Sequence, residues 1–333
     1  MKRYRNMVGL TVGAVIFLIL VGGIVRSTGS GMGCPDWPKC FGQWVPPTDV
    51  SQLPANYKEV FQVAGKEIAD FSAFKTWVEY VNRLLGVLIG FFALLTVAFS
   101  IPMRKIDARI TQLSIGALLL VIIQGGIGAI VVRTHLEVST ITIHMMIALV
   151  IMMVYIYAWI RSRGTLSVSN DRVSRSVLQR NLAIGGAVLL LTLLQIGMGT
   201  QVREQVDLVA LEMGESQRES WIAALSGVYD IHKLFHYVLT FGIVVWIAQL
   251  KKVGPFSSIQ KGSWIMVAIV AFEIGLGLWM HHGGIPAIAQ PLHLLGASGL
   301  IAAEFALMSL LFNAYLASTS TPAKKLDPQF SYK

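Results

Sequence analysis

Histidine is the residue type with the clearest chemical potential in this sequence, and its positions recur along the chain. His144, His232 and His293 each stand near the start of a long apolar segment. His144 and His293 are 149 residues apart, and Asn82 and His232 are 150 apart. Ionisable side chains inside apolar membrane segments are costly and usually functional. Neutral imidazoles on facing helices can hold haem iron from both sides, so this pattern predicts haem-binding sites.

The other four histidines are weaker candidates. His236 lies one turn after His232 on the same helix face, so it could be the ligand in its place or a supporting neighbour. His135 and the pair His281–His282 fall at segment ends, where a solvated role competes with a functional one. Zinc is improbable because the sequence contains neither HExxH nor paired CxxC spacing.

A second group of reactive residues lies between the first two apolar segments. Cys34 and Cys40 are the only cysteines, and a disulfide closing this short loop is plausible on an oxidising side of a membrane. Five residues separate them rather than two, so a structural clip competes with a redox role. Glu79 precedes Asn82 by three residues and projects from the same helix side. It could act as a general base or proton relay, or form an ion pair with Arg83 or another arginine.

Four further charged residues need an explanation inside or at the ends of apolar segments. Arg26, Arg133 and Arg203 end three of these segments, where they can pair with anionic groups such as haem propionates or extend to the membrane surface. Glu273 lies within an apolar segment and occupies the place of Gln124 in the repeat, 149 residues earlier. We expect it to be a hydrogen-bonded carboxyl inside a helical bundle.

Eight apolar segments must position these side chains. Hydrophobic residues make up 54% of the 333 residues and charged residues 14%, against roughly 25% in soluble domains. The mean hydropathy is +0.64. A helix needs about 20 apolar residues to cross a bilayer. The predicted spans are Met7–Val25, Leu84–Met103, Leu113–Val132, Ile141–Ile160, Leu182–Thr200, Leu234–Leu250, Trp264–Met280 and Pro291–Leu316.

The distribution of charge predicts how these spans are oriented. One set of loops, together with both termini, carries 17 Lys and Arg against 3 Asp and Glu, and the other set carries 10 against 13. Positive loops face the cytoplasm, so both termini are predicted to be cytoplasmic in a multi-pass protein of the cell (inner) membrane, in contact with membrane lipid. We do not interpret the net charge of +9 as nucleic-acid binding, because the basic residues are spread over short loops.

The sequence also contains an internal repeat. Small-residue runs close the odd-numbered spans, as in Gln124–Gly128 and Gln195–Gly199, and such runs let membrane helices approach closely. The expected fold is therefore an all-α integral membrane protein whose eight transmembrane helices form two pseudo-symmetric four-helix bundles. The predicted halves are residues 1–165 and 170–320, and they are parallel repeats because each has an even number of spans.

Three of these features together resemble the haem A synthase family. They are the run GGIVRSTGSGMGCPDWPKCFGQWVPP at 22–47, the run EYVNRLLG at 79–86, and the histidines near the starts of spans four, six and eight. The resemblance covers all eight spans. It implies an oxidoreductase that converts the substrate haem O to haem A by oxidising a methyl group to a formyl group, with water as the expected oxygen source. The product serves terminal oxidases, and the implied partners are haem O synthase and the terminal oxidase assembly.

The same resemblance implies roles for individual residues. His232 and His293 would ligate the iron of a resident haem b in the C-terminal half. His144 would face the substrate haem in the N-terminal half, which would make that half the substrate haem site. Glu79, Cys34 and Cys40 match catalytic positions of the family.

One departure from the family concerns Asn82, which stands where a histidine is usual. Amides are poor iron ligands, so three hypotheses stay open. The substrate haem could be bound through His144 alone, His135 could substitute, or the activity could be altered in this branch. A di-haem b-type electron-transfer cytochrome is the main alternative function, and Asn82 argues against it. A thiol oxidase or quinone-linked protein would leave the histidine repeat unexplained. A transporter would not account for polar residues gathered at one face.

Overall fold

Eight long α-helices dominate the computed structural model, which describes residues 1–163, 173–254 and 257–320. Short helical turns lie in the connections. The long helices are α1 (Lys2–Ser27), α3 (Ala73–Ser100), α4 (Ala108–Arg133), α5 (Val138–Ser162), α6 (Arg175–Met213), α8 (Gly227–Leu250), α9 (Ser257–His282) and α10 (Ala289–Ser320). The short helices are α2 (Tyr57–Val60) and α7 (Trp221–Ala224), with 3-10 turns at Val50–Gln52, Ile101–Lys105, Glu215–Ser220 and Lys251–Val253.

Each long helix is apolar and long enough to cross a bilayer, which confirms the prediction of eight spans. Large apolar side chains point away from the bundle, including Val87, Phe241 and Trp264, which are 71%, 70% and 73% exposed. In water such exposure would be costly, whereas lipid tails solvate it. The chain is a multi-pass membrane protein.

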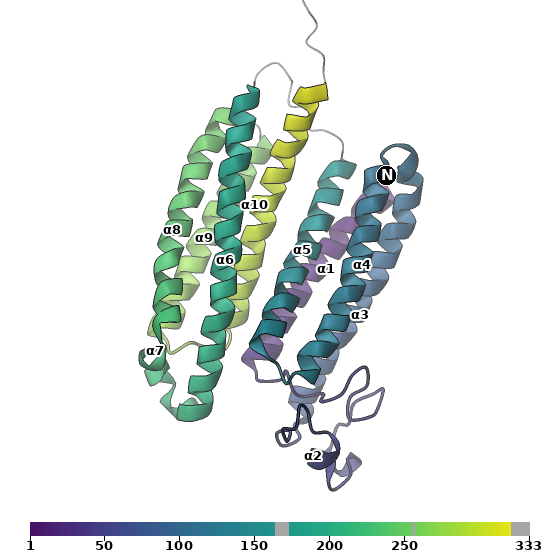
Figure 1. Ribbon diagram of the computed structural model, residues 1–333, viewed down its shortest axis with the longest axis vertical. Coiled ribbons are helices and arrows are strands. Elements are labelled where there is room, and N and C mark those ends of the chain that lie inside the picture. Colours follow the sequence, from purple (N-terminus) through teal and green to yellow (C-terminus); the bar gives the residue numbers. More distant parts are fainter. Residues whose placement is uncertain (164–172, 255–256, 321–333) are drawn as a thin grey trace, which may run out of the picture.

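The helices form two groups that meet along α10 (Figure 1). In one group α1 packs on α3 and α5, and α4 packs on α3 and α5. In the other, α6 packs on α8 and α10, and α9 packs on α10 and α8. The groups meet where α10 contacts α1 and α5, and where α5 contacts α6. The two-fold repeat of these groups remains a prediction, and its proposed boundary at 165–170 lies outside the described residues.

Several helices begin or end well beyond the apolar spans predicted for them. The second span was expected from Leu84, but α3 begins at Ala73, where the side chain of Ser72 accepts a bond from the backbone N–H of Lys75. The first turns of α3 contain polar residues, so hydropathy does not mark them as part of the span. Similarly, α6 continues past Thr200 to Met213 and ends at Gly214, whose positive φ of 75° closes the helix. Glu79 and Asn82 therefore lie inside α3 and not at its start.

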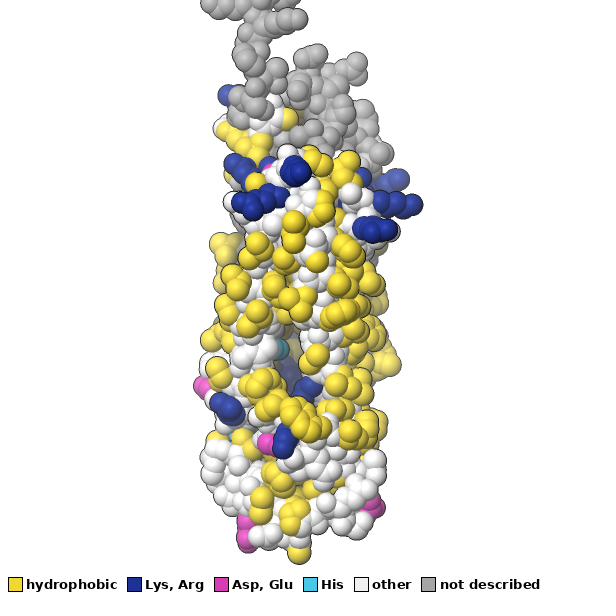
Figure 2. Space-filling model, turned by 90° about the vertical axis from the view of Figure 1, so that its right-hand side faces the viewer, with side chains coloured by type: hydrophobic (Ala, Val, Ile, Leu, Met, Phe, Trp, Pro, Cys, Tyr) yellow, Lys and Arg dark blue, Asp and Glu magenta, His cyan; other side chains and the backbone are white. Residues whose placement is uncertain are grey.

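The two ends of the bundle differ in charge. Dark-blue Lys and Arg side chains form a band towards one end in Figure 2, a hydrophobic belt follows, and the connection between α1 and α3 lies at the other end. We call these the basic end and the loop-bearing end. The C-terminal tail, which contributes to the predicted charge asymmetry, lies outside the described residues.

Residues 28–72, which connect α1 to α3, have a small core of their own. Phe41 is packed edge-on against the rings of Tyr57, Phe61 and Phe71, with centroid distances of 6.4, 5.3 and 5.7 Å. Cys34 and Cys40 are fully buried in this cluster and joined by a disulfide, as predicted. Together they make the connection a compact cap on the loop-bearing end.

Gly33 determines how closely this cap approaches α3. A Cβ at this position would lie 2.4 Å from the carbonyl oxygen of Lys75 and 2.8 Å from the backbone nitrogen of Thr76. Because these are backbone atoms of a helix, they cannot move aside cheaply. We expect Gly33→Ala to destabilise the cap by about 1–3 kcal/mol. Thermal unfolding of the purified protein in detergent, with and without a reductant, measures the loss.

Gly86→Ala is the matched control for this prediction. Gly86 lies in α3, and among the described residues no atom comes within 4 Å of an added Cβ. Alanine is also the better helix former, so this change should leave stability unaltered or slightly raised. Equal unfolding temperatures for Gly33→Ala and the unsubstituted protein would contradict a close, rigid contact between cap and helix.

Candidate functional site

Two predicted histidines come together between α8 and α10. His232 lies on α8 and His293 on α10, and their ring centroids are 6.4 Å apart. Two imidazoles on opposite sides of one metal ion, each with a metal–nitrogen bond of about 2 Å, have centroids roughly 6 Å apart. The spacing of the rings therefore fits axial ligation of one haem iron from both sides. We call this pair the C-terminal histidine pair.

Residues of neighbouring helices contact each histidine of the C-terminal histidine pair. The side-chain amide of Gln195 donates a 3.0 Å bond to the backbone carbonyl of His232. Gly199 leaves room for the same ring, since a Cβ there would lie 3.4 Å from its Cε1 atom. Nδ1 of His293 lies 2.9 Å from Oε2 of Glu273 on α9. Glu273 thus lies half-buried inside the bundle, as the sequence suggested, and its neighbour is a candidate iron ligand. The expected hydrogen bond is not confirmed, because among the described residues neither Nδ1 of His293 nor Oε1 of Glu273 has a hydrogen-bond partner.

His144 has a similar setting in the other group of helices. The amide of Gln124 on α4 donates a 2.8 Å bond to the backbone carbonyl of His144 on α5. A Cβ at Gly128 would lie 3.3 Å from Cε1 of the His144 ring. Gln124 thus serves His144 as Gln195 serves His232, with a small residue beside each ring.

Asn82 occupies the comparable place on α3. A Cβ at Gly22 of α1 would lie 3.9 Å from Oδ1 of Asn82. Gly22 stands four residues before Arg26, and Gly199 stands four residues before Arg203. The two glycines therefore have the same place in their helices, one beside an asparagine and the other beside a histidine.

The polar atoms of this region lack partners within the protein. Six polar atoms of the two candidate sites are buried without a hydrogen-bond partner among the described residues: Nδ1 of His144, His232 and His293, Oδ1 of Asn82, Oε1 of Gln124 and Oε1 of Glu273. Buried polar groups are normally satisfied, so unpaired ones beside candidate ligands suit a site that takes up a polar or metal-containing ligand. Figure 2, which faces the α3 and α4 side of the molecule, shows a hollow in which a histidine and Lys or Arg side chains are visible.

The remaining histidines do not join these rings. Nδ1 of the half-buried His236 contacts the backbone carbonyl of Lys233, and its ring lies against Tyr237 with centroids 3.9 Å apart. This geometry favours His232 over His236 as the ligand. His281, at the end of α9, shares a 2.6 Å hydrogen bond with the hydroxyl of Tyr229 on α8.

Protein-only metal binding requires a different arrangement from the one present. The described residues contain no group of three or more His, Cys, Asp and Glu side chains that could hold a metal ion. Haem iron has its equatorial ligands from the porphyrin and takes only axial ligands from the protein. Two facing histidines are therefore a sufficient donor set for haem.

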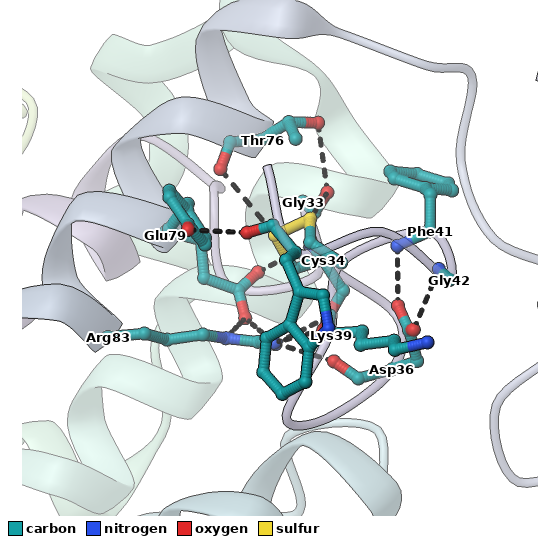
Figure 3. Close-up of a disulfide and its surroundings, with 12 residues drawn as sticks. Gly33, Cys34, Asp36, Lys39, Phe41, Gly42, Thr76, Glu79 and Arg83 are labelled. Carbon is teal, nitrogen blue, oxygen red and sulfur yellow. Dashed lines mark hydrogen bonds and ion pairs between the residues drawn. A yellow bond between two sulfur atoms is a disulfide. The ribbon is translucent and has the colours of Figure 1, made fainter. Parts of the chain in front are cut away.

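Glu79 and Arg83 join the cap to α3 (Figure 3). Oε2 of Glu79 accepts a 2.8 Å bond from the backbone N–H of Cys34, and its Oε1 accepts a 2.5 Å bond from Nη2 of Arg83. Arg83 also donates to the backbone carbonyls of Cys34, Asp36 and Lys39 at 2.6, 2.6 and 3.0 Å. Of the two interpretations that the sequence left open for Glu79, the structure shows the ion pair with Arg83.

Two of the three arginines predicted to meet an anion come together, and the third does not. Nη2 of Arg26 lies 3.2 Å from Oδ2 of Asp207, and Nη2 of Arg203 lies 2.7 Å from its Oδ1. Arg203 also donates to the backbone carbonyl of Arg26 at 3.1 Å. Arg133 ends α4 and is exposed. The anion that this structure gives Arg26 and Arg203 is a carboxylate of the protein itself.

The contacts of Asp207 with Arg26 and of Arg83 with the cap carbonyls had no clear signal in the sequence. Asp207 follows Arg203 by four residues, a spacing that favours an ion pair on one helix face, but nothing local indicated that Arg26 would share it. Arg83 was considered only as a partner for Glu79. Its bonds to three loop carbonyls depend on the fold of the cap, which has no simple periodic pattern.

Comparison with known proteins supplies the remaining observation. Residues 5–305 match the COX15-CtaA family, described as cytochrome oxidase assembly protein. The haem A synthase of Brucella suis is 24% identical over 327 residues, covering 90% of this chain and 86% of the relative. That of Bartonella quintana is 24% identical over 310 residues, covering 83% and 84%. No solved structure matches the chain. With nearly the whole chain matched, this protein belongs to the COX15-CtaA family of cytochrome oxidase assembly proteins.

Proposed function

We propose that this protein is a haem A synthase, an oxidoreductase that converts the methyl group of haem O to the formyl group of haem A. The observation that carries the proposal is the C-terminal histidine pair, 6.4 Å apart, in a chain that matches this family over residues 5–305. Membership of the family indicates the reaction. The distance between the two rings supports haem binding, and it could not be obtained from the sequence alone.

The C-terminal group of helices is the proposed site of a resident haem b. His232 and His293 would hold its iron, with Gln195 bonded to the backbone at His232 and Glu273 contacting His293. Bound there, haem b supplies a one-electron redox centre. The protein's contribution is to hold both rings on rigid helices and to exclude water with apolar side chains.

The N-terminal group of helices is the proposed site of the substrate haem. His144 is the proposed ligand, because its Nδ1 atom is buried and its backbone carbonyl accepts a bond from Gln124 as that of His232 does from Gln195. Asn82 would offer an amide beside the substrate and no second imidazole. This site would offer the iron one protein ligand, whereas the C-terminal histidine pair offers two. A single ligand suits a substrate haem that must enter and leave the site.

The cap is bonded to α3 through Glu79 and Arg83, and we propose that it contributes to the reaction. Water is the proposed source of the formyl oxygen, so the net conversion consumes water and releases protons and electrons. Glu79 is the proposed proton-handling residue of the cap, and Arg83 holds it in place. Cys34 and Cys40 form the disulfide beside it, and we propose that they act with it in catalysis. Arg26, Arg133 and Arg203 are the proposed partners of haem carboxylates; for two of them this requires exchange with Asp207.

The charge asymmetry supports an orientation for the whole molecule. We propose an inner-membrane location with the basic end and both termini in the cytoplasm, and with the cap on the oxidising side. A buried disulfide is stable on that side. Haem O synthase and the terminal oxidase assembly are the proposed protein partners, supplying the substrate and receiving the product.

Haem extraction tests the proposed function directly. The protein is purified from a host that also makes haem O, and its haems are separated by chromatography. We expect haem B together with haem O or haem A. Haem B alone, at two per chain, would favour the di-haem electron-transfer cytochrome. A preparation that contains no haem would contradict both functions.

A further inference from the structure

Glu273 has a contact that the proposed reaction does not require. It lies in the middle of α9, inside a membrane span, and its Oε2 is 2.9 Å from Nδ1 of His293. The side chains of Glu273 and His293 are 15% and 31% exposed. A carboxyl group in such a place is costly unless it is paired, and here its neighbour is a proposed iron ligand. The contact therefore links a potential negative charge to the haem site.

Gly296 makes room for this carboxyl group. It follows His293 by three residues on α10, and a Cβ there would lie 2.0 Å from Oε1 of Glu273. The lack of a side chain allows the carboxyl to lie against the α10 backbone beside the histidine. The placement of Glu273 thus depends on a feature of α10 as well as on its own helix.

The other group of helices has a different arrangement at the related position. Gln124, 149 residues before Glu273, donates to the backbone carbonyl of His144 and not to its ring. Among the described residues, Nδ1 of His144 and Nδ1 of His293 are both buried without a hydrogen bond of regular geometry, but Nδ1 of His293 lies 2.9 Å from a carboxylate oxygen and Nδ1 of His144 has no such neighbour. His293 therefore has a carboxyl group near its Nδ1 atom, whereas His144 has only the neutral amide of Gln124 at its backbone carbonyl. The two proposed haem sites therefore differ in that one has a carboxyl group beside its histidine ring and the other does not.

We propose that Glu273 is a positioning residue that accepts the Nδ1–H of His293, directs Nε2 of that ring towards the iron and favours ferric haem b. The inference rests on the proposed haem ligation by His293. A carboxylate on the distal nitrogen fixes the tautomer of a metal-bound histidine and makes the ring a stronger donor. Negative charge in a low-dielectric interior stabilises the more positive, oxidised iron. Haem b held this way has a lower midpoint potential than the same site with a neutral residue.

Two substitutions test this inference in different ways. Glu273→Gln removes the charge and keeps the size of the side chain. Gly296→Ala keeps the charge but displaces the carboxyl, and the clash is with the end of a flexible side chain, which can move without unfolding the helix. The control is Glu304→Gln, because Glu304 is a fully buried carboxyl on the same helix as His293 that bonds to Thr192 instead of a histidine.

The readouts are a redox titration of haem B in the purified protein and the electron paramagnetic resonance spectrum of its ferric form. We expect Glu273→Gln and Gly296→Ala to raise the midpoint potential and shift the low-spin signal, while Glu304→Gln matches the unsubstituted protein. Haem B bound at an unchanged potential in both test variants would overturn the inference. So would an equal rise in Glu304→Gln, because the effect would then belong to any buried carboxyl.

Loss of haem from one variant also has a defined meaning. If Glu273→Gln does not retain haem B, Gly296→Ala decides: a raised potential supports the inference, and an unchanged potential or a second loss of haem contradicts it. Failure of the proposed function would look different, since the unsubstituted protein would then lack the expected haems altogether.

Discussion

His144→Ala should lose haem O and haem A while retaining haem B, and His293→Ala should lose haem B. The reason is that the two histidines lie in different groups of helices, with His293 facing His232 and His144 bonded through its backbone to Gln124. Loss of a supporting residue typically lowers metal affinity by roughly 10–100-fold, and loss of the ligand itself should cost at least as much. Haem chromatography after extraction, normalised to protein, measures both losses. Turnover of haem O should fall to background in each variant.

His135→Ala is the control for the N-terminal site. His135 lies in the turn after α4, where its φ of 54° places it outside a helix. If His144 is the ligand, this variant keeps both haem fractions. Loss of haem O in His135→Ala but not in His144→Ala would assign the site to His135 and show that the sequence departure at Asn82 is compensated there.

Glu79→Ala should destabilise the protein by about 3–5 kcal/mol, because it leaves the guanidinium of Arg83 buried without its carboxylate. The side chains of Glu79 and Arg83 are only 5% and 14% exposed. The backbone N–H of Cys34 would lose its acceptor in the same step. Thermal unfolding in detergent measures the stability, and the rate of reduction and alkylation of Cys34 and Cys40 reports whether the cap has opened.

The double variant Glu79→Ala/Arg83→Ala separates the ion pair from the general loss of packing. If the two side chains act as a unit, the double variant should be less destabilised than the sum of the single changes. Glu59→Ala, an exposed acidic residue of the same cap, should change stability by less than about 0.5 kcal/mol. Additive effects at Glu79 and Arg83 would contradict the pair. Glu79→Gln with normal stability and reduced turnover would support its proposed role in proton transfer.

The sequence predicted the spans because lipid imposes a single strong requirement on a helix. Each predicted apolar segment lies within one helix, except that the second, Leu84–Met103, runs past α3 into the 3-10 turn at Ile101–Lys105. The helix ends were not predictable in the same way. The start of α3 at Ala73 and the continuation of α6 to Met213 involve polar residues, for which hydropathy carries no signal.

The candidate site was predictable where it depended on spacing and not where it depended on contacts across the fold. The disulfide and the meeting of His232 with His293 followed from residue types and the repeat. The partner of Glu273 did not, because it depends on the register of α9 against α10. Likewise, Asp207 meets Arg26 only because two distant helices end side by side.

The position of α10 has a consequence for how the protein is assembled during synthesis. This helix contacts α9, α6, α1 and α5, and so joins both groups of helices. Among the described spans it is also the last to leave the ribosome. Until it inserts, α1 and α5 lack one of their packing partners and His232 lacks the ring that faces it. A nascent chain that stops after α9 should therefore be a target for membrane quality control, and haem loading in the C-terminal group should follow completion of the chain.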